Sequence, residues 1–391
     1  MNWDITPVSK LCLLAMDCIN KTAPLSEIKT SYKMLRTSNI KDGFIDFDNV
    51  RYVEKDVFDK WTRRGAPKYG DVIFTREAPV GEVGRFTSRS KNYFLGQRTF
   101  IYRADPNKLD WNFLAYVLQS SQIQGWVNGI AYGATVPHLK VRDMEHLMIP
   151  NPPLRTQQKI AKILSNYDDL IENNLKRIKL LEESARLTYE EWFLRFRIDG
   201  KKLDIDPESG LPFGWLNKSF ADVFNINNGY AFESEDYTDH GVPILRTRDY
   251  SQTKWIEVNQ PIYISEELSQ KYTKYYVQEY DLMLIMVGAS IGNYGVVLPN
   301  DKGLLQNQNQ WAIRVNNGFE KYIFYKLLMM EDLIKNLLTR KTGAARDFFR
   351  ASFLKELDIL LPDEDTVILL NKTVESIFEE INNLRHQNQL L

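Results

Sequence analysis

The tripeptide Leu35-Arg36-Thr37 recurs unchanged as Leu245-Arg246-Thr247, 210 residues further along the chain. Other residues recur at nearly the same spacing, with drifts of one or two positions that loop insertions would produce. This pattern indicates a duplicated unit of roughly 210 residues. The further matches are Asp71 with Asp281, Gly81 with Gly292, Gly84 with Gly295, Gln97 with Gln308, Phe100 with Trp311, Arg103 with Arg314, Gly133-Ala134 with Gly343-Ala344, Leu147-Met148-Ile149-Pro150 with Ile359-Leu360-Leu361-Pro362, and Asn173-Asn174-Leu175 with Asn382-Asn383-Leu384.

Each copy has the same order of predicted elements. Short β-rich runs come first, then a strand pair punctuated by glycine, then an apolar helix and a final short strand. We therefore expect an α+β fold with two similar mixed α/β domains, at residues 1–154 and 200–362. The β-rich runs are residues 43–53 and 242–264, the strand pairs are residues 71–86 and 281–297, and the helices are residues 111–126 and 322–338.

A long helix is predicted after each domain, as a central spacer at residues 155–199 and a C-terminal helix at residues 363–391. Apolar residues recur about every 3.5 positions in both, which is typical of a coiled-coil seam. We expect the two helices to pack on each other as an antiparallel coiled coil, giving the chain pseudo-twofold symmetry. Asn174 falls on the seam and is expected to fix its register. The predicted seam residues are Ile160, Leu164, Tyr167, Ile171, Asn174, Ile178, Leu181, Leu370, Val374, Ile377, Ile381 and Leu384.

Composition is ordinary for a globular protein, with 43% hydrophobic and 26% charged residues among 391. We expect no membrane segment, because no apolar run approaches the ~20 residues that a membrane helix needs. Two cysteines, Cys12 and Cys18, are too few for a disulfide framework and fit a cytoplasmic protein. The net charge of −1 disfavours nucleic-acid binding unless charge is segregated, but basic residues do cluster at 85–103 and 335–350.

No motif in the sequence predicts a catalytic centre, a metal site or a cofactor site. Residues Asn151-Pro152-Pro153-Leu154 resemble the Asn-Pro-Pro-aromatic motif of adenine methyltransferases, but leucine replaces the aromatic residue that stacks on the flipped base. We interpret them as a proline-stiffened start to the long helix. The chain has no phosphate-binding Walker loop, and its four histidines lie far apart in sequence.

Several of these segments resemble the specificity subunit of type I restriction-modification enzymes. They are the glycine-rich strand pair, the loop Gly133-Ala134-Thr135-Val136-Pro137-His138-Leu139, the run of residues 149–160 leading into the coil, and Leu211-Pro212-Phe213-Gly214-Trp215. The resemblance covers nearly the whole chain. It implies two target-recognition domains that read the halves of a split double-stranded DNA sequence. It also implies helices that bind two modification (methyltransferase) subunits, with restriction (motor-nuclease) subunits joining. S-adenosylmethionine, ATP and Mg²⁺ are then expected on those partners.

Base reading requires hydrogen-bonding side chains at fixed places, and phosphate contacts supply affinity. Arg36 and Arg246 occupy matched positions and are expected to share a task, such as phosphate contact or domain structure. Positions that differ between the copies are expected to determine which DNA sequence each copy binds. Arg76 matches Met286 and Val136 matches Arg346 at two such positions. The candidates are Arg36, Thr37, Arg76, Gln97, Arg98, Tyr132 and Lys140 in the first copy, and Arg246, Thr247, Arg248, Gln308, Asn309, Lys341, Arg346 and Arg350 in the second.

Two other functions remain open from sequence. One is an enzyme that methylates or cuts DNA by itself, which would methylate DNA when purified alone with S-adenosylmethionine. The other is a coiled-coil scaffold without a nucleic-acid role, which would show no salt-dependent binding to duplex DNA when its partners are present.

Overall fold

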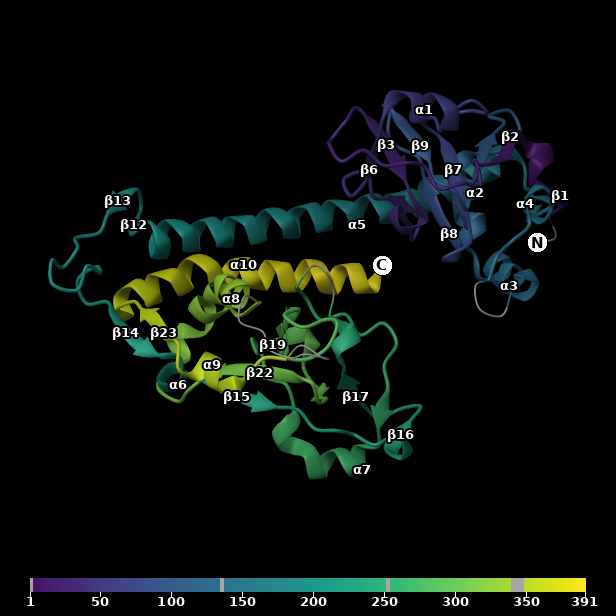
Figure 1. Cartoon of the computed structure of the whole chain (residues 1–391). Coiled ribbons are helices and arrows are strands. Elements are labelled where there is room, and N and C mark those ends of the chain that lie inside the picture. The colour runs from purple at the N-terminus through teal and green to yellow at the C-terminus, as the bar shows by residue number, and fades with distance from the viewer. Residues whose placement is uncertain (1–2, 134–136, 251–253, 339–347) are drawn as a thin grey trace. The chain divides into compact units, whose positions relative to one another are not determined.

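The computed structural model describes residues 3–133, 137–250, 254–338 and 348–391. The chain divides into two compact units, Met1–Leu170 and Ile171–Leu391, and each is described by itself. The boundary lies inside the long helix α5 (Leu154–Tyr189), which begins in the first unit and ends in the second (Figure 1). The four-part division expected from sequence, with limits at residues 154, 199 and 362, stays a prediction.

The first unit is built on a four-stranded antiparallel sheet with the order β2-β10-β7-β8. Helix α2 (Trp111–Gln119) covers one face of this sheet with its buried apolar side. A smaller sheet has the order β6-β3-β9, in which β3 and β9 run parallel. The strands are β1 (Ile5–Pro7), β2 (Cys12–Asp17), β3 (Tyr32–Leu35), β4 (Ile40–Lys41), β5 (Phe44–Ile45), β6 (Arg51–Val53), β7 (Asp71–Arg76), β8 (Val80–Arg85), β9 (Tyr93–Leu95), β10 (Thr99–Ala104) and β11 (Met148–Pro150), and the other helices are α1 (Lys55–Trp61), α3 (Ser121–Ile130) and α4 (Val141–Glu145).

The second unit repeats this plan. Its main sheet has the order β15-β22-β19-β20, and its smaller sheet contains the parallel pair β17-β21. A two-stranded pair closes each domain, β1 with β11 in the first and β14 with β23 in the second. The strands are β12 (Arg197–Ile198), β13 (Lys201–Lys202), β14 (Leu216–Ser219), β15 (Phe224–Asn228), β16 (Tyr237–Thr238), β17 (Val242–Leu245), β18 (Tyr263–Ile264), β19 (Leu282–Ile285), β20 (Tyr294–Val296), β21 (Leu305–Gln306), β22 (Gln310–Val315) and β23 (Asp358–Leu361), and the helices are α6 (Phe220–Val223), α7 (Glu266–Ser269), α8 (Ile323–Leu338), α9 (Ala351–Lys355) and α10 (Glu364–Leu390).

This shared strand order confirms the duplication and the predicted glycine-punctuated strand pairs. The helix expected at residues 111–126 differs, because it is two helices, α2 and α3. Ser120 separates them with an extended backbone, and its hydroxyl accepts a hydrogen bond from the backbone N–H of Ile123 (3.4 Å). Such a serine begins a new helix rather than continuing the old one.

Helix α5 starts at Leu154, directly after the prolines and one residue before the expected start of the spacer at residue 155. It ends in a π-helical turn at Glu190–Leu194. None of the helices in the described ranges is both long and apolar enough to cross a membrane.

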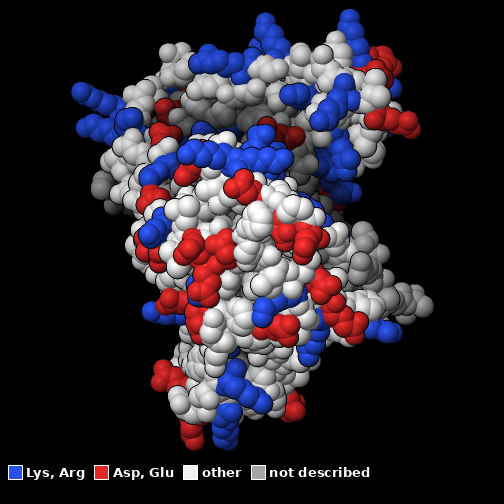
Figure 2. Space-filling view, turned by 90° about the vertical axis from the view of Figure 1, so that its left-hand side faces the viewer, with Lys and Arg blue, Asp and Glu red and all other residues white. Residues whose placement is uncertain are grey.

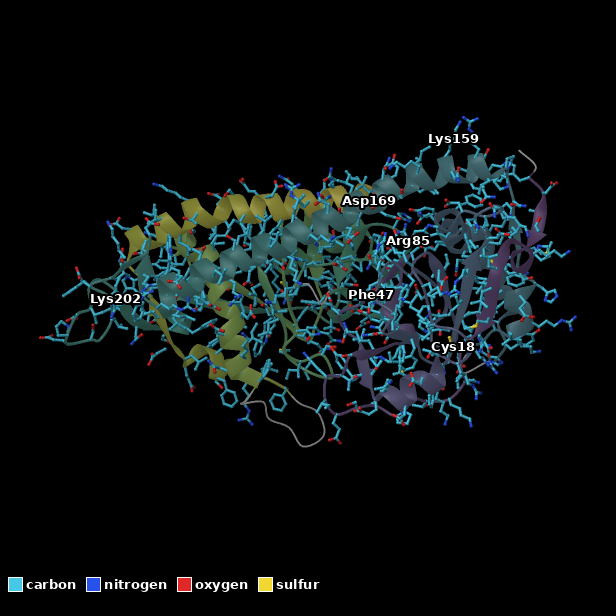
Figure 3. The ribbon with its side chains drawn as sticks, turned by 90° about the horizontal axis from the view of Figure 1, so that it is seen from above. Cys18, Phe47, Arg85, Lys159, Asp169 and Lys202 are labelled. Atoms are coloured by element: carbon cyan, nitrogen blue, oxygen red, sulfur yellow. The ribbon has the colours of Figure 1, made fainter. Side chains whose placement is uncertain are left out.

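Within the second unit, α5 and α10 lie side by side and antiparallel, as predicted (Figures 1 and 3). The side-chain amide of Asn174 donates hydrogen bonds to Gln387 Oε1 and Asn388 Oδ1, both at 2.8 Å. Arg177, about one turn further along α5, pairs with Glu380, about two turns earlier along α10 than Gln387 and Asn388. These contacts define the register of the pair.

The predicted seam residues are not all placed alike. Ile171, Leu181 and Ile377 are half-buried, and Ile160 packs partly against the core of the first unit. Leu164 and Tyr167 are exposed, at 37% and 48%. α10 ends at Leu390, within a turn of Gln387 and Asn388, which accept hydrogen bonds from Asn174. The fully buried members are Asn174, Ile178, Leu370, Val374, Ile381 and Leu384.

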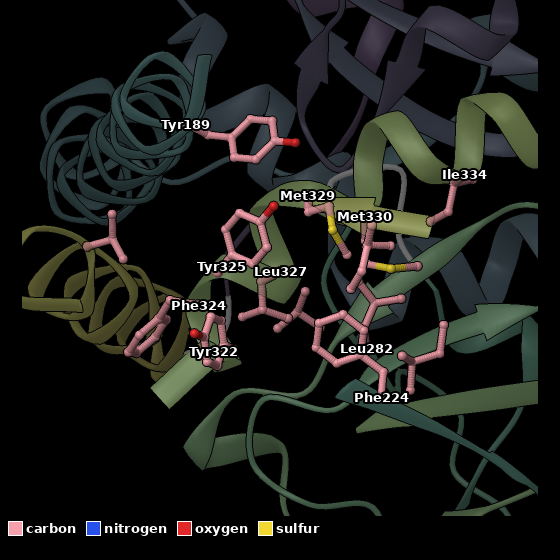
Figure 4. Packing of buried hydrophobic residues seen from close by; sticks show 14 of the residues in the cluster. Tyr189, Phe224, Leu282, Tyr322, Phe324, Tyr325, Leu327, Met329, Met330 and Ile334 are labelled. Carbon is pink, nitrogen blue, oxygen red and sulfur yellow. The ribbon is translucent and has the colours of Figure 1, made fainter. Parts of the chain in front are cut away.

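The core of the second unit joins the helices to the sheet (Figure 4). Tyr189 of α5 faces Tyr325 of α8, and Leu282 of the main sheet packs into the same cluster. Lys326 is fully buried beside this cluster, and its ammonium group donates to the backbone oxygens of Tyr280 (2.8 Å) and Ile313 (3.0 Å). Burial lowers the pKa of Lys326 to about 8.

Two matched ion pairs lock the main sheets. Arg103 of β10 binds Asp71 at the start of β7 through two hydrogen bonds of 2.8 Å, and Arg314 binds Asp281 through two of 2.7 Å. Both carboxylates are about 1% exposed. The recurrence of these residues in the sequence therefore has a structural cause.

We predict that Asp71→Asn destabilises the first unit by about 3 kcal/mol, because it leaves the Arg103 charge without its partner in a largely buried site. Asp281→Asn should act likewise on the second unit. Urea unfolding measures the effect as a shift in the urea concentration at the midpoint of unfolding. Asp48 is exposed, and the control variant Asp48→Asn should leave this midpoint unchanged. A midpoint equal to that of the control would show that the pair does not stabilise the sheet.

Replacing Lys326 should change how stability depends on pH. The pKa of Lys326 is about 8 in the folded protein and 10.5 in the unfolded chain. Between these two pH values the unfolded chain holds the Lys326 proton and the folded protein has released it. The free energy of unfolding of the wild type therefore increases as pH rises through this range. The stability of Lys326→Met relative to wild type should therefore fall by about 2 kcal/mol between pH 7 and pH 10. Unfolding curves at several pH values measure it. The exposed Lys355→Met should show a constant difference, and a constant difference for Lys326→Met would contradict the prediction.

Candidate nucleic-acid interface

The structure brings four of the predicted DNA-reading residues together at one end of the main sheet of the first unit. There the backbone N–H of Arg76 donates to Arg98 O (2.7 Å), and the backbone N–H of Leu139 donates to Arg76 O (3.0 Å). His138 pairs through its backbone with both Glu77 and Tyr132. We call this arrangement the first clasp. It comprises Arg76, Glu77, Arg98, Tyr132 and residues 138–140.

The side chains of the first clasp are polar and partly exposed. Arg98 pairs with Glu77 at 3.3 Å between Nε and Oε1, and their side chains are 39% and 28% exposed. The Lys140 ammonium group lies over the Tyr132 ring, 3.9 Å from its centroid. Arg76 instead has a structural role, because its Nη1 donates to Leu139 O (2.9 Å).

The second unit contains the same backbone arrangement. The N–H of Met286 donates to Asn309 O (3.1 Å), and the N–H of Phe349 donates to Met286 O (2.8 Å). Val287 pairs with Phe348 as Glu77 pairs with His138. We call Met286, Val287, Asn309 and residues 348–350 the second clasp. The predicted match of Arg76 with Met286 is thereby confirmed in space.

An unusual backbone conformation is common to both clasps. Arg98 has a φ of 72° and Asn309 a φ of 70°. Few residues other than glycine adopt this left-handed conformation, and asparagine does so more readily than arginine. Arg98 is therefore held in a conformation that its own side chain disfavours.

The matched Leu-Arg-Thr segments perform one structural task in both copies. The backbone N–H of Arg36 donates to Asn39 Oδ1 (2.9 Å), and that of Arg246 donates to Asp249 Oδ2 (2.7 Å), so each caps a short 3₁₀ turn. The hydroxyl of Thr37 also donates to Ala78 O (2.8 Å), beside the first clasp. The turn that contains Thr247 is held further by the guanidinium groups of Arg246 and Arg248, which both donate to Gln260 O.

The remaining candidates lie at the margins of the clasps. Gln97 precedes Arg98 and donates weakly to Thr22 Oγ1 (3.4 Å). Gln308 precedes Asn309, and its side chain is exposed. Arg350 lies near the ring of Phe348, with 5.8 Å between the guanidinium carbon and the ring centroid. Lys341, Arg346 and Val136 lie outside the described residues.

Several clasp residues were missed from sequence. Glu77, Val287 and Phe348 were not selected, although Glu77 and Val287 directly follow the matched pair Arg76 and Met286. Comparing the two copies one residue further would have found the contrast between Glu77 and Val287.

Several members of the two basic runs are paired with acids and do not contribute to a free basic surface, while Arg340, Lys341 and Arg346 of the second run lie outside the described residues. Arg85 is buried and binds Asp168 (2.6 Å) and the hydroxyl of Tyr116, while Arg103 binds Asp71. Lys335 pairs with Glu331 (3.3 Å) on its own helix. On the face shown in Figure 2, basic and acidic side chains are intermixed. Net charge along the sequence was misleading for Arg85 and Arg103, because the acids that compensate them come from distant segments.

The groups that could support chemistry have other roles or are inert. Burial raises the pKa of the Cys12 and Cys18 thiols to about 12, which keeps them protonated and poorly nucleophilic at neutral pH. The Asn151 side chain accepts a hydrogen bond from the buried Gln157 (3.1 Å) at the start of α5. Among the described residues, no group of three or more His, Cys, Asp or Glu side chains could hold a metal ion.

Comparisons with known proteins agree with this duplicated architecture. Residues 20–183 and 212–390 match the family model described as the type I restriction modification DNA specificity domain. The chain is 24% identical to the MjaIX specificity subunit of Methanocaldococcus jannaschii, over 88% of this chain and 81% of that one. It is 23% identical to the EcoBI specificity subunit of Escherichia coli, over 91% and 78%.

A solved S subunit from M. genitalium has the same fold. It superimposes with a TM-score of 0.54 at 17% sequence identity, over 100% of this chain and 95% of that one. The two matches to one family model together span most of the sequence and coincide with the two copies seen in the structure. The chain therefore belongs to the family of type I restriction-modification DNA specificity proteins.

Proposed function

We propose that each domain of this specificity protein reads one half of a split, asymmetric double-stranded DNA target through its clasp. The observation that carries the proposal is the pair of clasps, which share a backbone arrangement and differ in their side chains. A common backbone presents the side chains in equivalent places, and different side chains recognise different bases. One target made of two unlike halves follows from this arrangement.

The features common to both clasps fit contact with the DNA backbone. Each has a cation next to an aromatic ring, Lys140 with Tyr132 and Arg350 with Phe348. Lysine and arginine contacts to phosphate supply affinity and position without reading sequence. Arg36 and Arg246, whose backbones cap turns in both copies, serve the domain structure.

The helices supply docking surfaces for other subunits in this proposal. We assign two modification (methyltransferase) subunits to the region of α5 and α10, with restriction subunits joining the assembly. The chain itself catalyses no reaction, and S-adenosylmethionine, ATP and Mg²⁺ are held by those partners. The exposed apolar side chains Leu164, Tyr167, Leu180 and Leu187 of α5 support this assignment, because such residues on a helix are typical of contact surfaces.

Selection of bound DNA from a random duplex pool tests the proposal, with the complex reconstituted from this chain and its modification subunits. We predict a target of two different half-sequences separated by unread base pairs. Binding should weaken steeply with salt because phosphate contacts release counterions. Recovery of one contiguous palindrome would contradict two unlike readers, and the modification subunits alone serve as the control that selects nothing.

A further inference from the structure

The two clasps differ in a way that has chemical meaning for the bases they meet. Where the first has Glu77 and Arg98, the second has Val287 and Asn309 at the equivalent backbone positions. All four side chains are partly exposed. Each clasp also has a cation near an aromatic ring, although Phe348 occupies the position of His138 and not that of Tyr132. The clasps differ in hydrogen-bonding groups where Glu77 matches Val287 and Arg98 matches Asn309.

Arg98 and Glu77 together suit a G·C pair. In the major groove guanine presents two acceptors, which an arginine can bind through two hydrogen bonds, and cytosine presents an amino donor that a carboxylate accepts. The 3.3 Å contact between Arg98 and Glu77 places a donor and an acceptor side by side, as the two bases of one pair require.

Asn309 and Val287 suit an A·T pair by the same argument. An asparagine amide can donate to and accept from adenine, and an apolar side chain can contact the methyl group of thymine. The Asn309 side chain is partly exposed, and within the described ranges it makes no hydrogen bond. Its backbone carbonyl is held by Met286, which fixes the position of the residue.

The conformation of Arg98 adds a separate argument. A left-handed backbone is unfavourable for arginine, and strained residues of this kind concentrate at functional sites. Asparagine fills the equivalent place in the second clasp at nearly the same φ and with less strain. The presence of arginine at such a position is better explained by a role in DNA recognition than by a role in folding.

We propose that the clasp of the first domain selects a G·C base pair in its half of the target, and that the clasp of the second domain selects an A·T base pair in the other half. This inference rests on the proposed function. It adds the class of base pair that each domain reads.

Exchanging the two clasps tests the inference in the reconstituted complex. One variant carries Glu77→Val with Arg98→Asn, and the reciprocal variant carries Val287→Glu with Asn309→Arg. We expect the first variant to change one base pair in one half of the selected target from G·C to A·T, with a preference shifted roughly tenfold or more. The reciprocal variant should change one pair in the other half from A·T to G·C.

Each variant contains its own control, because the half read by the unaltered domain should be selected as before and so reports a folded, binding complex. Arg98→Asn alone relieves backbone strain and should lose the preference for G·C at that same pair. Unchanged halves in both exchange variants, or shifts in the opposite direction, would overturn the inference. A wild-type selection that returns a single palindrome overturns the proposed function instead, and this inference with it.

Discussion

The pairing of α5 with α10 is the constraint on which the second half of the molecule depends. Asn174 is fully buried in that interface, and its amide nitrogen binds Gln387 and Asn388. Its Oδ1 has no hydrogen-bond partner within the described structure, and a buried acceptor without a partner costs roughly 1–3 kcal/mol. A leucine there would pack without that cost. The asparagine is better explained by register, since only one alignment of the helices lets its amide donate twice.

That alignment has consequences for the domain beneath the helices. Phe378 of α10 and Tyr189 of α5 belong to one apolar cluster with α8 and the main sheet. Slippage of α10 along α5 would separate Arg385 from Asp301 (2.9 Å), an ion pair that joins α10 to the globular part. The register of the helices and the packing of the domain are therefore coupled.

The two domains separate what is common from what is variable. The Arg–Asp pairs, the parallel strand pair, the capped turns and the backbone hydrogen bonds of the clasps recur in both copies. The side chains at the tips of the clasps do not recur. A duplicated scaffold can in this way change the DNA that each half reads while keeping the interactions that hold its sheets together.

The sequence predicts those features that depend on local pattern or on the internal repeat. The duplication, the strand pairs and the antiparallel helices follow from spacing alone, and Asn174 stands out on its seam. Partners far apart in sequence could not be predicted, as with Arg85 and Asp168, which turned an apparent basic run into a buried ion pair. The extent of the seam was overestimated for Leu164 and Tyr167, which are exposed, because periodicity alone does not show which apolar residues another helix covers.

Site-specific photocrosslinking tests the central claim of two matched DNA readers most directly. A photoreactive side chain placed at His138 marks the first clasp, and one placed at Phe348 marks the equivalent backbone position in the second. In the complex with modification subunits on its DNA target, the two should crosslink to opposite halves, while the same group at the exposed Lys201 gives no crosslink. Crosslinks of both clasps to the same half, or of neither clasp to DNA, would contradict the account.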